Sequence, residues 1–408
     1  MTSTKASTPR KRLAVAAGVA VLLCADAATA VARPAGPPAA ADLSAPAGSS
    51  ATAGPSVPEQ LRRDTAALHD LGISGVQARA IGPDGRQAVA TSGTADVTTG
   101  RPVSPDGYFR MASTAKTLVA TVVLQLEAEG RLSLDDTVGH WLPEVARAKG
   151  GAGITVRRLL QHTGGIKDDL PGYGTKDEYE QERHKVYTPE ELVARAEFLD
   201  DTGWRYSNTG YIMLDMIIER ATGRPAEREV EDRVLRPLGL DRTRTTGTSP
   251  TLPRPHARAY QLFPAPDGRV DVTEQIPMVS GLSWVTTTRD ENVFLRALLG
   301  GRLLPARQLA EMKETVPVDA ATEALWPHGR YGLGLVERPL DCGGSFWGHD
   351  GGDAGFITVN GVTEDGRRSA VVSMSEALGD TPDHIEAQEG AAGALIEHAL
   401  CAGSPGGR

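Results

Sequence analysis

The sequence predicts an α+β protein, an α/β sandwich whose antiparallel β-sheet is built from both chain ends and flanked by helices. Three observations predict this fold class. Strand patterns occur near the start and again near the end of the 408-residue chain. Helical patterns fill the middle, where a mostly helical subdomain is expected at about 132–325. No internal repeat is found, which excludes a repeat architecture.

The N-terminus has the pattern of a secretory signal peptide over residues 1–30. Four basic residues precede an apolar run from Leu13 to Ala25, and small residues follow. The run is too short to span a bilayer comfortably, so a secreted, extracellular protein is expected, with an uncleaved membrane anchor as the alternative. Residues 31–58 are mostly Ala, Pro, Gly and Ser, which predicts a disordered linker before a folded domain at 59–402.

The composition, 40% hydrophobic and 23% charged, is ordinary for a globular protein. The formal net charge of −9 argues against a nucleic-acid-binding protein. Beyond the signal region the cysteines are Cys342 and Cys401. An oxidising compartment favours a disulfide between them, and two separate buried thiols are the alternative. No His, Cys or carboxylate cluster has metal-ligand spacing, so neither a metal nor another cofactor is expected.

The first expected elements are a helix from Glu59 to Leu71 and a hairpin with strands at Val76–Ile81 and Gln87–Thr91, joined by a Gly-Pro-Asp-Gly turn. A charged segment at 167–187 is expected to be a lid or a plain solvated loop. Helical patterns occur at Leu132–Leu142, Val156–His162, Pro189–Phe198 and Asn292–Leu299, and after Asn208. Strand patterns return at Tyr331–Val336, Phe346–His349, Phe356–Val362 and Ser369–Met374, before a helix at Ile385–Leu400.

Residues 110–130 predict a buried helix around which the chain is organised. Apolar residues recur along one stripe, and Gly130 stands where a helix end favours glycine. At its front, Ser113 and Lys116 share one face, with Cβ atoms about 5–6 Å apart. The free N–H groups and positive dipole of the first turn favour an alkoxide and lower the lysine pKa, which activates a serine without a histidine. Because Ser-x-x-Lys is a short motif, a capping serine and a surface lysine are the alternative.

Two later motifs strengthen this interpretation. Tyr206-Ser207-Asn208 lies in a loop just before a helix, and His349-Asp350-Gly351 ends a strand. The glycines of this region, including Gly352, allow a substrate backbone to approach closely. Taken singly, each motif has a plain alternative: a buried tyrosine, a helix-capping asparagine or an ordinary strand-end histidine. Their order and spacing after Ser113 indicate a site of nucleophilic catalysis.

With the serine–lysine pair, these motifs resemble those of the penicillin-recognising serine hydrolases, namely the serine D-Ala-D-Ala carboxypeptidases, class C β-lactamases and related esterases. The resemblance covers roughly residues 60–402. It includes Tyr331–Leu335 and Leu159–Gly165, whose His162 matches a family turn and is expected to be structural. The likeness is strongest to secreted actinobacterial D,D-carboxypeptidases, in which a histidine replaces the lysine of the third motif. It implies a β-lactamase/transpeptidase-like fold and a disulfide between the two cysteines.

The resemblance also implies roles for the site residues. Ser113 attacks an acyl carbon, and Lys116 and Tyr206 share the proton that it loses. Tyr206 then passes a proton to the leaving group and activates the deacylating water. A phenol becomes a useful base only when nearby positive charge lowers its pKa, and Lys116 or a protonated His349 would supply that charge. Asn208 holds Lys116 or the substrate.

By resemblance, the substrate strand contains Asp350, Gly351 and Gly352, and the oxyanion hole uses N–H groups of the nucleophile and of a residue around Gly352. Two departures bear on the substrate. Asp350 stands where relatives carry a hydroxyl residue and should repel a substrate carboxylate. Val336 stands where relatives carry an arginine that grips this carboxylate, although Arg338 shares its strand face and could substitute.

We therefore expect a secreted serine hydrolase that forms an acyl-enzyme on Ser113, of the D-alanyl-D-alanine carboxypeptidase or β-lactamase type. An esterase or D-amino-acid amidase on the same scaffold is one alternative, and a non-catalytic penicillin-binding module is another. The expected ligands are a small peptide, a β-lactam or an ester, including a peptidoglycan stem peptide. No nucleic-acid partner and no stable membrane anchor are expected, and the chain is expected to be a monomer.

Overall fold

The computed structural model describes residues 56–201, 203–277 and 283–402. The expected signal peptide and nearly all of the expected linker lie outside the described residues. Helix α1 (Val57–Asp70) begins at Val57 rather than at Glu59, because Ser56 and Glu59 form a capping box at its N-terminus.

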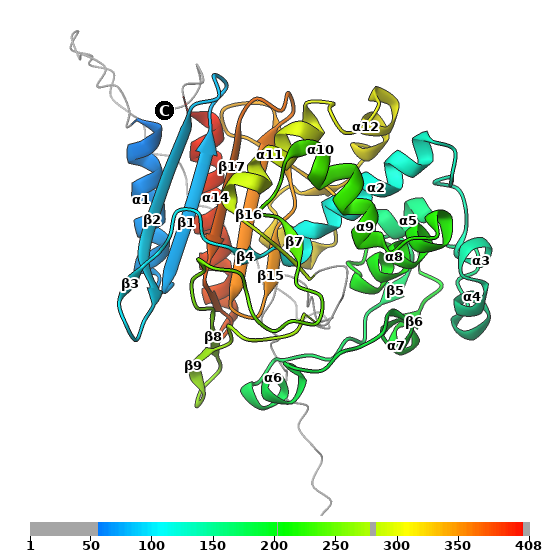
Figure 1. Ribbon diagram of the computed structural model, residues 1–408, viewed down its shortest axis with the longest axis horizontal. Coiled ribbons are helices and arrows are strands. Elements are labelled where there is room, and N and C mark those ends of the chain that lie inside the picture. Colours follow the sequence, from blue (N-terminus) through cyan, green and yellow to red (C-terminus); the bar gives the residue numbers. More distant parts are fainter. Residues whose placement is uncertain (1–55, 202, 278–282, 403–408) are drawn as a thin grey trace, which may run out of the picture.

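A ten-stranded antiparallel sheet joins the two chain ends (Figure 1). At its centre, β1 (Gly75–Ile81) pairs with β17 (Ser369–Met374), and β17 pairs with β16 (Phe356–Thr363). β1 also pairs with β2 (Gln87–Asp96), as the hairpin pattern predicts. The remaining strands are β3 (Arg101–Pro102), β11 (Val316–Pro317), β12 (Arg330–Tyr331), β13 (Val336–Pro339), β14 (Ser345–Gly348) and β15 (Gly351–Asp353). The predicted fold class is confirmed.

The single strand expected at Tyr331–Val336 is two strands, β12 and β13, with a tight turn between them. Gly334 in this turn has φ +79°, and a Cβ there would lie 2.5 Å from the Cβ of Ala120. The carbonyl of Gly334 accepts a hydrogen bond from Thr117 Oγ1 at 2.7 Å. The chain turns here because its backbone docks directly on the helix that follows Ser113.

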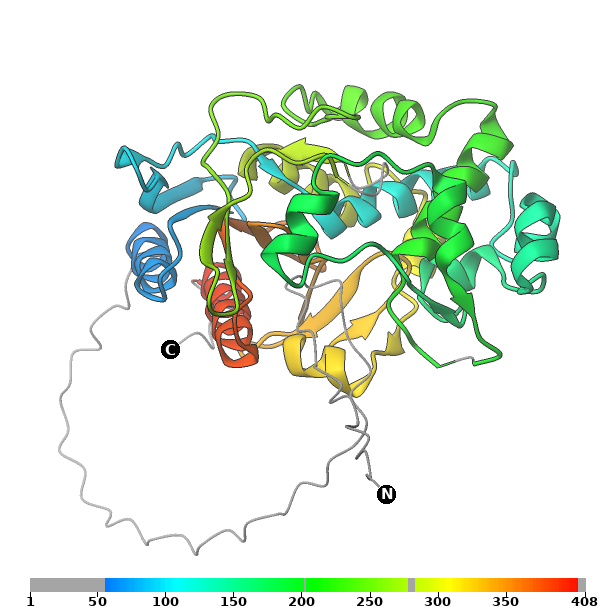
Figure 2. The ribbon, with the colours of Figure 1, turned by 90° about the horizontal axis from the view of Figure 1, so that it is seen from below.

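Helices cover both faces of the sheet. α1 and α14 (Pro382–Cys401) lie side by side on one face (Figure 2). α11 (Thr288–Leu299) packs against the other face. α2 (Lys116–Ala128) lies between the sheet and the helices of residues 138–238, called the helical half. Thr117–Leu124 of α2 are all buried. The apolar stripe predicted a helix with one buried face, but neighbouring elements cover α2 on all sides.

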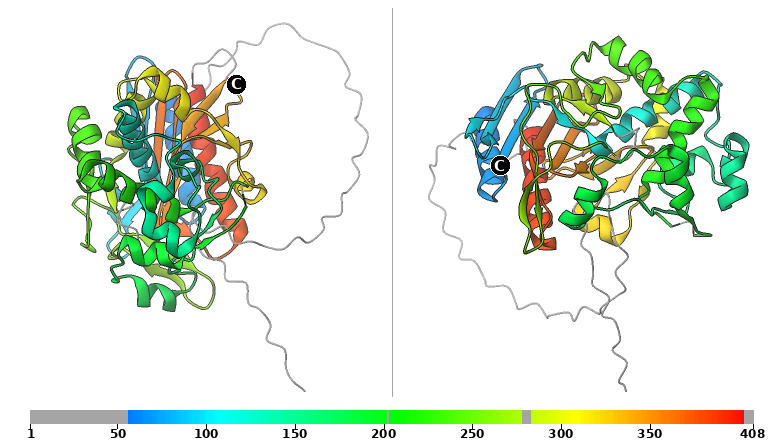
Figure 3. Two further views of the ribbon diagram at one scale, coloured as in Figure 1. Left: turned by 90° about the vertical axis from the view of Figure 1, so that its right-hand side faces the viewer. Right: turned by 60° about the horizontal axis from the view of Figure 1, so that its bottom comes forward.

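The helical half lies on the side of the molecule away from α1 and α14 (Figure 3). Within it, α8 (Asn208–Thr222) packs against α2. The other helices of the chain, inside and outside this half, are α3 (Val138–Trp141), α4 (Pro143–Lys149), α5 (Val156–Leu160), α6 (Lys176–Glu182), α7 (Pro189–Arg195), α9 (Ala226–Val230), η2 (Glu231–Leu235), α10 (Arg236–Leu238), α12 (Ala306–Met312) and α13 (Ala320–Leu325). The short strands are β4 (Phe109–Arg110), β5 (Ile166–Lys167), β6 (Glu197–Phe198), β7 (Arg244–Thr245), β8 (Tyr260–Phe263), β9 (Gly268–Asp271), β10 (Trp284–Thr286) and β18 (Glu376–Leu378).

The structure differs in detail from two further predictions made from the sequence. The helix expected over Leu132–Leu142 is limited to α3, because Ser133 N donates to the Asp136 side chain at 2.8 Å and starts a turn instead. The segment 167–187 is not a plain loop, since it contains α6 with its own capping box at Thr175. Across the described ranges, no helix combines the length and apolarity that crossing a membrane requires.

The predicted disulfide is present. Cys342 and Cys401 are bonded, with Cα atoms 5.7 Å apart. The bond ties the turn between β13 and β14 to the last turn of α14.

Candidate active site

Ser113 lies in a tight 3-10 turn, η1 (Ala112–Ala115), which follows β4 and continues directly into α2. The sequence placed Ser113 in the first turn of the α-helix, but that helix begins at Lys116. Ala112, the residue before Ser113, has φ 49°. This left-handed conformation is strained for a residue with a Cβ, and such strain is concentrated at functional sites.

Strand β15 lies against this turn. A Cβ on Gly351 would be 2.4 Å from the Met111 carbonyl oxygen and 2.9 Å from Thr114 Cγ2. Only glycine allows the strand to approach the turn of the nucleophile so closely. Gly352 follows on β15, so the predicted strand glycines and Ser113 are brought together.

Lys116 is buried beside Ser113. Its Nζ donates hydrogen bonds to Ser113 Oγ at 3.0 Å and to Asn208 Oδ1 at 2.7 Å, and it lies 4.9 Å from the centroid of the Tyr206 ring. Burial lowers the pKa of Lys116 to about 7, although the nearby carboxylate of Asp168 acts to raise it. An amine with this pKa is neutral in about half of the molecules at pH 7, so it can accept the Ser113 proton.

Tyr206 also faces the nucleophile, but as a neutral phenol. Burial raises its pKa well above the ordinary value, and the adjacent Ser113 hydroxyl only partly opposes this effect. No hydrogen bond of ordinary geometry reaches its Oη within the part of the chain that the structure describes. The pKa lowering expected for Tyr206 is therefore absent. The phenol is a proton donor at neutral pH, and Lys116 is the better base.

A directed chain of hydrogen bonds links the second motif to the third. Ser207 N donates to His162 Nδ1 at 3.1 Å, so the ring proton of His162 is on Nε2, which donates to Tyr331 Oη at 3.1 Å. Tyr331 then donates to His349 Nε2 at 2.9 Å, and His349 Nδ1 donates to the Asp350 carbonyl at 2.7 Å. Each donor in this chain has one acceptor, which fixes the tautomers of His162 and His349.

His349 is consequently neutral. Burial lowers its pKa to about 3, and the charge of Lys116 adds to the effect. Both ring nitrogens are occupied, so His349 does not supply the positive charge that the sequence analysis assigned to it. His162, expected to be structural, takes part in the chain that holds His349 in place.

The side chain of Asp350 pairs with Arg338. The two contacts, Arg338 Nη1 to Oδ2 at 3.0 Å and Nη2 to Oδ1 at 2.8 Å, form a bidentate salt bridge. Both side chains are buried, next to Glu389 of α14, whose pKa burial raises to about 8. Because each charge compensates the other, this pairing argues against the expected repulsion of a substrate carboxylate by Asp350 and against Arg338 as its binding group.

Asp168 belongs to the candidate site, although the sequence placed it only in a charged segment. Its carboxylate accepts hydrogen bonds from Ser207 Oγ at 2.7 Å, Asn208 N at 2.6 Å and Thr209 N at 3.1 Å. An anion at the N-terminus of α8 is favoured by the helix dipole and by the free N–H groups. Asp168 therefore positions Asn208, which in turn holds Lys116. No local pattern indicated this, because the contact joins segments far apart in the chain.

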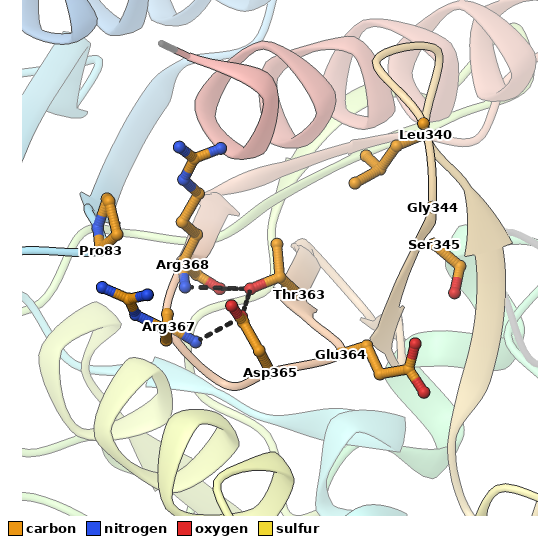
Figure 4. A pocket seen from close by; sticks show the side chains of 10 residues that line it. Pro83, Leu340, Gly344, Ser345, Thr363, Glu364, Asp365, Arg367 and Arg368 are labelled. Atoms are coloured by element: carbon orange, nitrogen blue, oxygen red, sulfur yellow. Dashed lines mark hydrogen bonds between the residues drawn. The ribbon is translucent and has the colours of Figure 1, made fainter. Parts of the chain in front are cut away.

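Two large hollows in the described parts of the chain have linings that do not include Ser113. One, of about 400 Å³, lies beside the disulfide-bonded turn, where the backbone N–H groups of Arg367 and Arg368 donate to the side chains of Asp365 and Thr363 in the β16–β17 hairpin (Figure 4). The other, of about 1080 Å³, is lined by both arginines and carboxylates, and Arg258 there is paired with Asp271.

The fold and the arrangement of Ser113, Lys116 and Tyr206 define a serine hydrolase with a β-lactamase-type fold. Residues 61–395 match the family model described as Beta-lactamase, and the chain belongs to this family. The predicted membership of the penicillin-recognising serine hydrolases is confirmed.

Among solved structures, the chain is similar to a D-stereospecific amidohydrolase from Streptomyces sp., with 34% identity, a TM-score of 0.70, and coverage of 80% of this chain and 96% of that one. It is also similar to the D-amino acid amidase of Ochrobactrum anthropi SV3, solved with L-phenylalanine amide, with 27% identity, a TM-score of 0.69, and coverage of 83% and 99%.

Among curated proteins, Penicillin-binding protein 4 of Amycolatopsis lactamdurans is 30% identical over 308 residues, which are 68% of this chain and 74% of that protein. The chain spans only 34%, 62% and 41% of the length of three other curated relatives.

Proposed function

We propose that this protein hydrolyses amides or esters of D-amino acids or short D-peptides through an acyl-enzyme on Ser113, and that its substrates carry no carboxylate on the leaving-group side. The observation that carries this proposal is the buried Arg338–Asp350 pair. The guanidinium best placed by sequence to bind a C-terminal carboxylate is already neutralised inside the protein. The similarity to the D-stereospecific amidohydrolase and the D-amino acid amidase supports the same substrate class.

The reaction follows from the contacts of the site. Ser113 Oγ attacks the substrate carbonyl carbon, and its proton passes to Lys116 Nζ, 3.0 Å away. The bond from carbon to the leaving nitrogen or oxygen then breaks, and the leaving group takes a proton through the Tyr206 hydroxyl. A water molecule attacks the acyl ester, gives its proton to the same relay and restores Ser113. N–H groups of Ser113 and Gly352 would stabilise the oxyanion.

A second candidate is a D-alanyl-D-alanine carboxypeptidase, the activity that the motif resemblance favoured. The 30% identity to Penicillin-binding protein 4 supports it. It requires a group other than Arg338 for the carboxylate of the terminal D-alanine.

A substrate panel separates these functions. We expect turnover of D-phenylalanine amide and p-nitrophenyl acetate, slower cleavage of the L-amide, and no cleavage of diacetyl-Lys-D-Ala-D-Ala. Intact mass should show an acyl adduct on the wild type and none on Ser113→Ala. Cleavage of the D-Ala-D-Ala peptide in preference to the amides would establish the carboxypeptidase instead. An adduct with a fluorescent penicillin but no turnover of any substrate would establish a non-catalytic binding module.

We further propose that the protein is exported and monomeric. The Cys342–Cys401 disulfide supports an oxidising compartment, which agrees with the signal-peptide pattern at 1–30. N-terminal sequencing of protein recovered from the culture medium and light scattering of the purified protein test the two statements.

A further inference from the structure

The strand that carries the third motif is interrupted at His349. β14 pairs with β16 up to Trp347, and β15 resumes pairing with β16 at Gly351, in the same register. That register sets His349 opposite Asn360, yet neither residue belongs to a ladder pair of these strands.

The side chain of Asn360 fills this interruption. His349 N donates to Asn360 Oδ1 at 3.0 Å, and Asn360 Nδ2 donates to the His349 carbonyl at 3.0 Å. The amide thus makes the two hydrogen bonds that a neighbouring peptide group would make. Because one bond is accepted and the other donated, the positions of Oδ1 and Nδ2 are determined.

Two neighbours hold the amide in this place. Nδ2 also donates to Glu291 Oε1 of α11 at 2.6 Å, and Asn360 and Glu291 are both buried. On the other side, a Cβ on Gly348 would lie 2.5 Å from the carbonyl oxygen of Asn360 and 2.5 Å from its Oδ1. Only glycine at 348 leaves room for the inserted amide.

An inserted side chain separates two strands more than direct pairing does, and it redirects the residues that follow, as a bulge does. Here the following residues are Gly351, which lies against the turn of the nucleophile, and Gly352. The orientation of β15 toward Ser113 therefore depends on how far His349 is held from β16.

We propose that Asn360 and Glu291 are positioning residues of the active site: Asn360 sets the orientation of β15 and of its oxyanion N–H group, and Glu291 holds Asn360. This inference rests on the proposed acyl-enzyme function. Both residues are buried, so neither is expected to touch the substrate. Both act through the backbone of residues 349–352.

The test compares Asn360→Ala and Gly348→Ala with a matched control, Asn292→Ala. Asn292 is an equally buried amide on α11 that bonds Ser369 Oγ and the carbonyls of Arg79 and Thr288 instead of the third motif. For each variant, kcat and KM with p-nitrophenyl acetate are measured beside the thermal unfolding midpoint. We expect Asn360→Ala and Gly348→Ala to lower kcat about 10- to 100-fold with little change in KM, since small displacements of catalytic groups have effects of this size.

Asn292→Ala should lower the unfolding midpoint while kcat per folded molecule changes less than about twofold, because its contacts are structural. Glu291→Gln keeps an oxygen acceptor for Asn360 Nδ2 and should retain kcat, whereas Glu291→Ala should lower it. The inference is overturned if Asn360→Ala keeps the wild-type kcat, or loses activity only in proportion to unfolding, as the control does. A wild-type protein that is never acylated at Ser113 overturns the proposed function itself, and this inference with it.

Discussion

Lowering the pH from 7 to 5 should slow acylation of Ser113 about 50-fold. Lys116 accepts the serine proton only when it is neutral, and its pKa is about 7 because the amine is buried. The neutral fraction is then about one half at pH 7 and about one hundredth at pH 5, and the rate of a base-catalysed step follows this fraction. Above pH 8 the rate should be level.

The assay is the pre-steady-state burst with p-nitrophenyl acetate between pH 5 and 9, corrected for spontaneous hydrolysis, with the Ser113 adduct counted by intact mass. Glu389→Gln is the matched control, because it removes a buried carboxyl with a pKa of about 8 that does not contact the nucleophile. The control should keep the midpoint of the fall in burst rate near pH 7. A burst rate that is flat from pH 5 to 7, or that rises only near pH 10, would refute the assignment of Lys116 as the base.

Three further outcomes are expected. Lys116→Met should lower the rate of acylation roughly 10²–10⁴-fold. It should also remove a pH dependence of stability, because the unfolded chain keeps the Lys116 proton up to its ordinary pKa of 10.5, whereas the folded protein releases it near pH 7. In urea unfolding, the stability of the wild type should therefore rise from pH 7 to 10.5 relative to the variant. Arg338→Met should cost about 3–5 kcal/mol by leaving Asp350 buried and unpaired, and adding Asp350→Leu should recover most of that loss; equal stability of the single and double variants would contradict the pairing. Asp168→Ala should lower the stability by about 1–2 kcal/mol, because the α8 cap is lost. It should also move the midpoint of the acidic fall in acylation rate below pH 7, because this carboxylate raises the Lys116 pKa. A shift of this midpoint to higher pH would contradict the effect assigned to Asp168.

Much of the candidate site was predictable because it depends on short sequence motifs. Ser113 and Lys116 are three residues apart, and local geometry alone places such side chains together. The strand patterns at both chain ends predicted the sheet, since alternation and turn residues are local signals. The second and third motifs joined this site by resemblance, and the hydrogen bonds of Lys116 to Ser113 and Asn208 agree with that placement.

What the sequence by itself determined is which residue types carry the chemistry and the order in which they occur. The tertiary structure alone decided their protonation states and partners. Burial lowers the pKa of Lys116 to about 7 and keeps His349 and Tyr206 neutral, and burial depends on elements that are distant in the chain. The same holds for Arg338 and Asp350. The sequence suggested opposite effects of these side chains on a substrate carboxylate, but the fold buries them together as an ion pair.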